Sequence, residues 1–168
     1  MKEIEIKLKY IDENLFRDRL RNLKAKFVDK YEIIDCYYAK NGETMKTADN
    51  LLRIRTKKAV SELTFKGRRE TDGDVWERVE INVPIENPEN MEKILDKIGF
   101  KLIRKNKTIR EYFLLGDAEI ALVIIIEPVK LEFVEIEGKT KENVERVAKL
   151  FEEVLEPIGK DYFSALDK

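Results

Sequence analysis

The sequence predicts an α+β fold: a closed eight-stranded antiparallel β-barrel, or tunnel, with about three flanking α-helices. Eight segments alternate apolar and polar residues with the period of two that is typical of strands. Three others carry apolar residues at helical spacing behind a capping residue. Eight strands are enough to close a barrel. The 168 residues contain no linker or low-complexity stretch, so we expect one domain over residues 1–168.

The first predicted strand, "EIEIKLKY", is followed by a helix over 12–24 with Asp12 as its candidate N-cap. A long strand then ends at the turn signal Asn41-Gly42. The alternating runs "LLRIRTK", "SELTFKGR" and "VWERVEINV" follow as three further strands. In full, the strands are expected at 3–10, 27–40, 51–57, 61–68, 75–83, 101–115, 119–125 and 130–138.

Two more helices are predicted in the second half of the chain. The segment "NPENMEKILDKIGF" has Asn87 as cap, Pro88 at the first helical position and Gly99 as its stop. Its expected buried face is Met91, Ile94, Leu95 and Ile98. Thr140 caps the last helix, which Pro157 ends. The apolar residues that we expect this helix to bury are Val144, Val147, Ala148, Phe151, Val154 and Leu155.

The composition excludes several classes of site. The 33 basic and 34 acidic residues leave a formal charge of −1, without the basic excess of a nucleic-acid-binding protein. The absence of histidine, with Cys36 as the single cysteine, excludes a disulfide framework and a Cys/His zinc site. A metal would have to be a hard cation bound by oxygens. Cys36 is interpreted as a packed strand residue or an incidental surface thiol.

The first residues are too charged for a signal peptide, and the apolar run "ALVIII" at 121–126 is too short to cross a bilayer. We therefore expect a cytoplasmic protein that does not bind membranes. The abundance of Lys and Glu is typical of heat-adapted proteins. The sequence does not fix the oligomeric state, and a homodimer is compatible with it.

Charged residues share one face on five of the predicted strands, because side chains alternate between faces. The bases on these faces are Lys7, Arg53, Arg55, Lys66 and Arg78, and the acids are Glu3, Glu5, Glu80, Glu135 and Glu137. Taken singly, each such face would be solvated. If the helices cover the aliphatic face outside a barrel, however, the charged face lies inside.

An enclosed set of five acids and five bases is costly without ligands, so such an interior is best explained as a binding site. Carboxylates bind Mg²⁺ or Mn²⁺, while arginine and lysine bind phosphate oxygens. The set therefore indicates a site for a metal-bound polyphosphate. Neither "GETMKTAD" nor "GRRETDGD" has the glycine spacing of a P-loop or a Rossmann turn.

Several of these strand segments resemble the sequence motifs of a known family. "EIEIK" resembles the ExExK signature of the CYTH family, the triphosphate tunnel metalloenzymes. "DCYYA", "LLRIR", "LTFKG", "ERVEI" and "FVEIEG" are similar to further strands of that family, so the likeness spans the chain. The family fold is an eight-stranded antiparallel tunnel, and the family includes class IV adenylyl cyclases, thiamine triphosphatases and tripolyphosphatases.

The resemblance implies roles for individual residues. The residues implied in catalysis are Glu3, Glu5 and Lys7. Those implied in binding the triphosphate are Lys7, Arg53, Arg55, Lys66, Arg78 and Arg110. Those implied in binding Mg²⁺ or Mn²⁺ are Glu3, Glu5, Glu80, Glu135 and Glu137. Arg110 matches a family arginine, and whether Lys107 is the lysine that accompanies this arginine in the family depends on the strand register. Tyr162 loosely resembles a residue of the family's C-terminal motif.

One departure bears on the activity. Ile125 stands where cyclases and phosphatases of the family commonly have an aspartate, and Glu127 is a candidate replacement. We expect a class IV adenylyl cyclase-like enzyme that converts ATP to cyclic AMP and pyrophosphate. The alternatives are a triphosphatase acting on thiamine triphosphate, a nucleoside triphosphate or tripolyphosphate, a binding module without turnover, and a structural β-domain with solvated charged faces.

Overall fold

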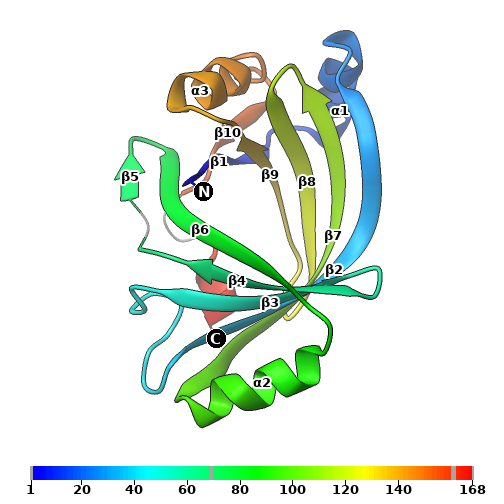
Figure 1. Ribbon diagram of the computed structural model, residues 1–168. Coiled ribbons are helices and arrows are strands. Elements are labelled where there is room, and N and C mark those ends of the chain that lie inside the picture. The colour runs from blue at the N-terminus through cyan, green and yellow to red at the C-terminus, as the bar shows by residue number, and fades with distance from the viewer. Residues whose placement is uncertain (1, 69, 160–161, 168) are drawn as a thin grey trace.

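The computed structural model describes residues 2–68, 70–159 and 162–167, and shows an antiparallel barrel with helices outside it (Figure 1). The strands are β1 (Lys2–Tyr10), β2 (Lys26–Lys40), β3 (Leu51–Lys57), β4 (Val60–Lys66), β5 (Glu70–Asp72), β6 (Val75–Ile85), β7 (Phe100–Leu115), β8 (Ala118–Glu127), β9 (Leu131–Glu137) and β10 (Leu155–Pro157). The helices are α1 (Glu13–Asn22), α2 (Pro88–Lys97), α3 (Lys141–Lys149) and the 3₁₀ turn η1 (Ser164–Asp167).

Strand β1 closes the barrel because it pairs on both sides. It is antiparallel to β9, with Lys7 opposite Glu135, and to β6, with Glu3 opposite Arg78. The pairing runs β1-β9-β8-β7-β2-β3-β4-β6 and returns to β1, while the short strands β5 and β10 add to β6 and β1. The predicted closed eight-stranded antiparallel barrel with three α-helices is therefore confirmed for the described part of the chain.

The helices begin where their caps predict. The side chains of Asp12, Asn87 and Thr140 accept hydrogen bonds from backbone N–H groups of the first turn, at 3.0, 2.8 and 3.2 Å. Gly99 follows α2 with φ of +90°, a backbone conformation that side chains with a Cβ rarely adopt.

The main hydrophobic core lies outside the barrel, under α1 and α3. Ile4 and Ile6 of β1 pack there with Phe16 and Leu20 of α1 and with Val147 of α3. These two helices lie near one end of the barrel, whereas α2 lies near the other (Figure 1). Because the aliphatic side of β1 is used by this outer core, its Glu3, Glu5 and Lys7 side must face the interior.

A second, smaller outer core lies under α2. Leu95 is buried there against Cys36, Tyr38 and Ile54. Cys36 is thus a packed strand residue, one of the two interpretations that the sequence allowed. The predicted face of α2 is only partly buried, however, since Ile94 is 52% exposed and Ile98 is 62% exposed.

Two sequence expectations about the outer surface are wrong in detail. Helix α3 ends at Lys149, and Leu155 lies in β10, opposite Tyr10, instead of in the helix. The apolar residues 151, 154 and 155 are buried as expected, but through turns and an edge strand. The outer face of β6 is also left without a helix, so that Val79, Ile81 and Val83 are exposed. No helix in the described residues is both long and apolar enough to cross a membrane.

The outer core generates a stability prediction. Phe16 has no exposed surface, whereas its neighbour Leu15 is 53% exposed. Phe16→Ala should lower the free energy of unfolding by about 3–5 kcal/mol, because it leaves a cavity between α1, β1 and α3. Leu15→Ala is the matched control and should change it by less than about 1 kcal/mol. Denaturant titration would measure both, and equal losses would show that α1 is not anchored by this face.

Candidate active site

A cavity of about 610 Å³ lies inside the barrel, and all eight barrel strands contribute side chains to its wall. Every site residue that the sequence proposed lines it: Glu3, Glu5, Lys7, Arg53, Arg55, Lys66, Arg78, Glu80, Arg110, Glu135 and Glu137. Strand alternation explains this placement, since the residues between them are aliphatic and point to the outside of the barrel. The described lining has eight acidic and eight basic side chains. It is therefore formally neutral and does not favour a simple anion or a simple cation.

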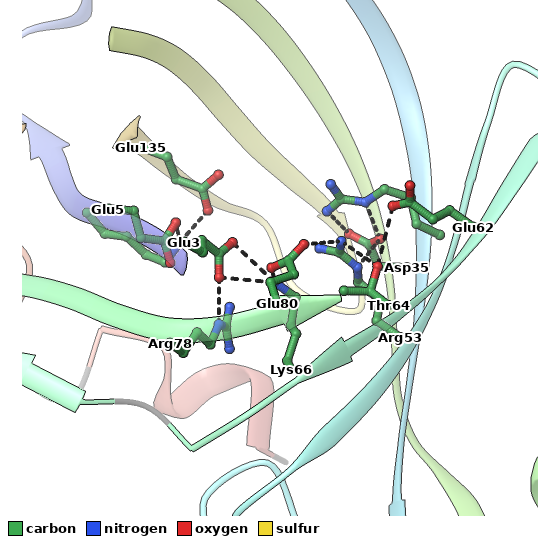
Figure 2. A network of polar contacts seen from close by, with 12 residues as sticks. Glu3, Glu5, Asp35, Arg53, Glu62, Thr64, Lys66, Arg78, Glu80 and Glu135 are labelled. Carbon is green, nitrogen blue, oxygen red and sulfur yellow. Dashed lines mark hydrogen bonds and ion pairs between the residues drawn. The ribbon is translucent and has the colours of Figure 1, made fainter. Parts of the chain in front are cut away.

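Lys66 lies at the centre of the first charged network. Its ammonium group donates to both carboxylate oxygens of Glu3 at 3.2 Å and to Glu80. Arg78 donates through Nε to Glu3 at 2.6 Å, as Figure 2 shows. Burial disfavours the charged form of Glu3, but Lys66 and Arg78 outweigh it and hold the pKa of Glu3 well below its usual range.

The pKa of Lys66 moves the other way. Burial, with a smaller contribution from nearby Arg53, lowers it to about 8 despite the attraction of Glu3 and Glu80. Lys66 is only 2% exposed. Its ammonium group thus depends on its carboxylate partners to stay charged at neutral pH, and phosphate oxygens could take the same role.

Asp35 organises the neighbouring guanidinium groups. Arg55 donates to its two carboxylate oxygens at 2.7 and 2.8 Å, a bidentate pair. Arg53 donates to Thr64 at 3.0 Å, and its Nη2 lies 3.5 Å from Glu80. These contacts fix the orientation of both guanidinium groups at the barrel wall, and Figure 2 shows Arg53 beside Thr64 and Glu80.

The second network joins β1, β7 and β9. Lys7 donates to Glu5 at 2.9 Å and to Glu135, and Arg110 donates to the other oxygen of Glu135. Burial of Glu135 opposes its ionisation, but Arg110 and Lys7 lower its pKa below the usual range. Lys7 also lies 5.4 Å from the ring centre of Trp76.

Glu137 differs from the other carboxylates because acids surround it. Desolvation, followed by the neighbouring carboxylates Glu3, Glu5 and Glu119, raises the pKa of Glu137 to about 7. Glu119, which is opposite Glu137 in the β8–β9 pair, also has a raised pKa, chiefly from desolvation. A divalent cation beside these groups would favour their ionised forms.

The carboxylates that could bind a metal are present, but they form ion pairs with lysines and arginines. In the described part of the chain, no three acidic side chains form a ready-made group that could hold an ion. Glu3, Glu5, Glu80 and Glu135 each contact a lysine or arginine instead. All of these donors are carboxylate oxygens, which suit Mg²⁺ or Mn²⁺. The residues therefore fit such an ion in their chemistry, provided that they exchange their basic partners for it.

Two buried guanidinium nitrogens lack an acceptor. Nε of Arg53 and Nε of Arg110 form no hydrogen bond with any residue that the structure describes. The nearest carboxylate oxygen of Asp35 is 3.8 Å from Arg53 Nε, too far for a hydrogen bond. Buried N–H donors of a charged group are costly when unpaired. Both residues line the cavity, and a bound anion could supply the missing acceptors.

Sequence reasoning missed five charged residues of the described lining: Asp35, Lys46, Asp74, Arg104 and Glu119. Lys46 and Asp74 lie in turns, whereas Asp35, Arg104 and Glu119 lie on the inward faces of β2, β7 and β8. Asp35 and Glu119 could have been predicted from the alternation of side chains along their strands. Arg104 is harder to assign, because β7 carries charges on both faces.

The structure also places four residues whose roles the sequence left open: Lys107, Ile125, Glu127 and Tyr162. Lys107 is not among the cavity residues and its ammonium group lies 3.0 Å from Glu32, so it does not accompany Arg110. Ile125 lines the cavity, whereas Glu127 is exposed and is not part of its wall. A register shift in the β7–β8 pair separates the two, so Glu127 does not replace the expected aspartate. The hydroxyl of Tyr162 donates to the backbone carbonyl of Glu132.

Comparison with known proteins agrees with this architecture. A model of the CYTH domain matches residues 1–168. A protein of Methanocaldococcus jannaschii named "Putative adenylate cyclase MJ0240" is 34% identical over 156 residues, covering 93% of this chain and 87% of the relative.

Two solved structures share the fold. The PH1012 protein of Pyrococcus horikoshii has a TM-score of 0.76 at 24% identity and covers 99% of both chains. HpAC1 of Hippeastrum, described with a dominant triphosphatase activity, has a TM-score of 0.75 at 17% identity and covers 98% of this chain and 94% of its own. Since the family model spans the whole chain and the tunnel has the expected strands and lining, this chain belongs to the CYTH domain family.

Proposed function

We propose that this protein is a divalent-metal-dependent enzyme that binds a triphosphate inside the tunnel, and that it converts ATP to cyclic AMP and pyrophosphate. The observation that carries triphosphate binding is a pair of buried donors that no described residue pairs, Nε of Arg53 on β3 and Nε of Arg110 on β7, in two residues that line one cavity. The cyclase assignment draws support from the name of the M. jannaschii relative, whose similarity covers 93% of the chain.

The proposed binding step is an exchange of partners. Lys7, Lys66 and Arg110 now neutralise carboxylates, and each would turn to a phosphate oxygen of the substrate. Arg53, Arg55 and Arg78 complete the proposed phosphate-binding set. Asp35 would keep Arg55 in place during the exchange, because both carboxylate oxygens of Asp35 accept hydrogen bonds from the Arg55 guanidinium group.

The carboxylates released by this exchange are the proposed metal ligands: Glu3, Glu5, Glu80, Glu135 and Glu137. A bound Mg²⁺ or Mn²⁺ would neutralise negative charge on the phosphates and lower the pKa of an attached oxygen nucleophile. Glu3, Glu5 and Lys7 are the proposed catalytic residues, and β1 presents all three to the cavity in successive inward positions.

In the proposed reaction the ribose 3′-hydroxyl oxygen attacks the α-phosphorus. The bond from that phosphorus to the oxygen bridging the α- and β-phosphates breaks, pyrophosphate leaves, and the hydroxyl proton passes to a basic group or water. The arginines and lysines would stabilise the charge that develops on the phosphate oxygens. Water attacking the terminal phosphate in the same tunnel would instead give triphosphatase products.

A second candidate is a module that binds triphosphates without converting them. The observation that favours it is Ile125, which puts an aliphatic side chain in the cavity wall where related enzymes commonly have an aspartate. Glu127 does not compensate, as it is outside the wall.

Analysis of the products tests the proposed reaction. Purified protein incubated with ATP and Mg²⁺ or Mn²⁺ should release cyclic AMP and pyrophosphate in equal amounts, as resolved by chromatography. ADP and phosphate would identify a triphosphatase. Metal-dependent ATP binding without any product would identify the binding module, and the absence of triphosphate binding would contradict the proposal as a whole.

Arg110 and Lys107 provide a matched pair on β7. Arg110→Gln should lower kcat/KM for the triphosphate by roughly 100-fold or more, because it removes a charge at the phosphates. Lys107→Gln, outside the tunnel, should stay within about twofold of the wild type. The rates should be corrected for the folded fraction, since breaking the buried Arg110–Glu135 pair also costs stability. Equal effects of the two substitutions would remove Arg110 from the site.

Glu135 and Glu132 test the metal in the same way on β9. Glu135→Gln should raise the Mg²⁺ concentration needed for half-maximal activity by about 10-fold, because it weakens a proposed carboxylate ligand. Glu132→Gln, whose carboxylate pairs with Lys130 at 2.7 Å, should leave that concentration unchanged. A metal titration at saturating ATP measures both. An unchanged metal requirement in Glu135→Gln would exclude Glu135 as a ligand.

A further inference from the structure

The tunnel face of β7 carries two buried polar side chains that the charged networks do not use. Asn106 is 7% exposed and Thr108 is 2% exposed. Oδ1 of Asn106 and Oγ1 of Thr108 form no hydrogen bond with any residue in the described ranges. Both residues line the central cavity, and they occupy successive inward positions between Arg104 and Arg110.

The neighbouring charges do not satisfy them. Asp35 is the strand partner of Asn106 but gives both carboxylate oxygens to Arg55, at 2.7 and 2.8 Å. Thr108 is opposite Ile33 on one side and Ile125 on the other, and neither side chain can hydrogen-bond. A buried polar group without a partner destabilises the fold, and apolar residues would fill these positions without that penalty. Their presence therefore points to a partner that enters the cavity.

The wall next to these two residues is apolar. Val123, Ile125 and Phe133 form a buried cluster with Leu166 of η1, and all four line the cavity. Phe163 packs edge-on against Phe133 at 5.1 Å between ring centres. A mostly apolar wall with a few convergent polar groups is typical of sites for organic ligands. The tunnel thus carries charged side chains on all of its strands, and beside Asn106 and Thr108 it has a section of apolar wall.

The chemistry of the two polar groups restricts the ligand. An asparagine amide offers one acceptor and one donor end, whichever way it is turned, so its partner must supply a donor and an acceptor side by side. Phosphate oxygens are only acceptors at neutral pH, and desolvation against aliphatic side chains disfavours them further. An amino-substituted nitrogen heterocycle offers N–H and ring nitrogen together, and asparagine pairs with adenine in this way. Its flat faces would pack on the apolar wall.

We propose that Asn106, Thr108 and the apolar wall around Ile125 form a subsite for the amino-substituted heterocyclic base of an organic triphosphate, with adenine as the best fit. This inference rests on the proposed function, because the charged side chains of the tunnel must hold the triphosphate to which the base is attached. It makes Asn106 and Thr108 specificity-determining residues. It also gives Ile125 a role in the wall of this subsite.

Binding measurements with three probes test the subsite. Isothermal titration in Mg²⁺ would compare ATP, purine riboside triphosphate, which lacks only the amino group, and inorganic tripolyphosphate. ATP should bind the wild type at least 10-fold more tightly than either of the other two. In Asn106→Leu the affinity for ATP should fall about 10-fold, whereas that for tripolyphosphate should stay within twofold.

Thr108→Val and Thr56→Val form a matched pair. Thr108→Val should weaken ATP binding by about 3- to 10-fold, as expected for the loss of one hydrogen bond. Thr56 is on the same sheet but outside the cavity, where its hydroxyl lies 2.9 Å from that of Ser61, so Thr56→Val should leave ATP affinity unchanged. Equal effects of the two substitutions would overturn the role of Thr108.

Thermal unfolding without ligand separates recognition from a structural role. If Asn106 serves the ligand, Asn106→Leu should not lower the melting temperature, because it removes a buried acceptor, Oδ1, that no described residue pairs. A lower melting temperature with equal losses for all three probes would show a structural role and overturn the subsite. Equal binding of ATP and tripolyphosphate by the wild type would overturn the subsite alone. Failure of all three probes to bind would contradict the proposed triphosphate site and the subsite with it.

Discussion

Closure of the barrel around charged side chains is the constraint on which the rest of this structure depends. Once β1 pairs with both β9 and β6, the inward residues of every strand share one enclosed space. Unpaired charges there would cost several kcal/mol each. The wall therefore alternates acids and bases, so that Lys66 contacts Glu3 and Glu80, and Glu135 contacts Lys7 and Arg110. This pairing stabilises the tunnel, and each paired group can exchange its partner for a ligand of the same charge.

Much of this architecture could be predicted from the sequence, because strand alternation and charge reinforce each other. The repeat of two or three charged positions on one face of each strand, in "EIEIK", "LRIR" and "VEIE", fixes which face is inward, whichever strands are neighbours. Asp35 and Glu119 were missed because neither has a second charged residue two positions away within its strand. The third helix was predicted too long because residues 151, 154 and 155 continue a helical apolar pattern. Their burial comes from turns and from the pairing of β10 with β1, a tertiary contact that local spacing does not encode.

Other features depend on geometry that no local pattern contains. The irregular register between β7 and β8 puts Ile125 in the wall and leaves Glu127 out of it, although the two are one pleat apart in sequence. The exposed row Val79, Ile81 and Val83 on β6 has the same alternation as buried β1, but the three helices do not reach it. Whether a strand face is covered depends on where the helices dock, and this is settled by tertiary packing.

The paired wall also implies that the proposed metal and triphosphate would bind together. A cation alone would release Lys7, Lys66 and Arg110 from their carboxylates and leave them buried without partners. A triphosphate alone would take those bases and leave Glu3, Glu80 and Glu135 unpaired, with Glu137 already crowded by other acids. When the metal and the triphosphate bind together, the metal pairs with the released carboxylates and the triphosphate pairs with the released lysines and arginines. Coupling between the two ligands would then arise from charge balance in an enclosed space, without any movement of the barrel.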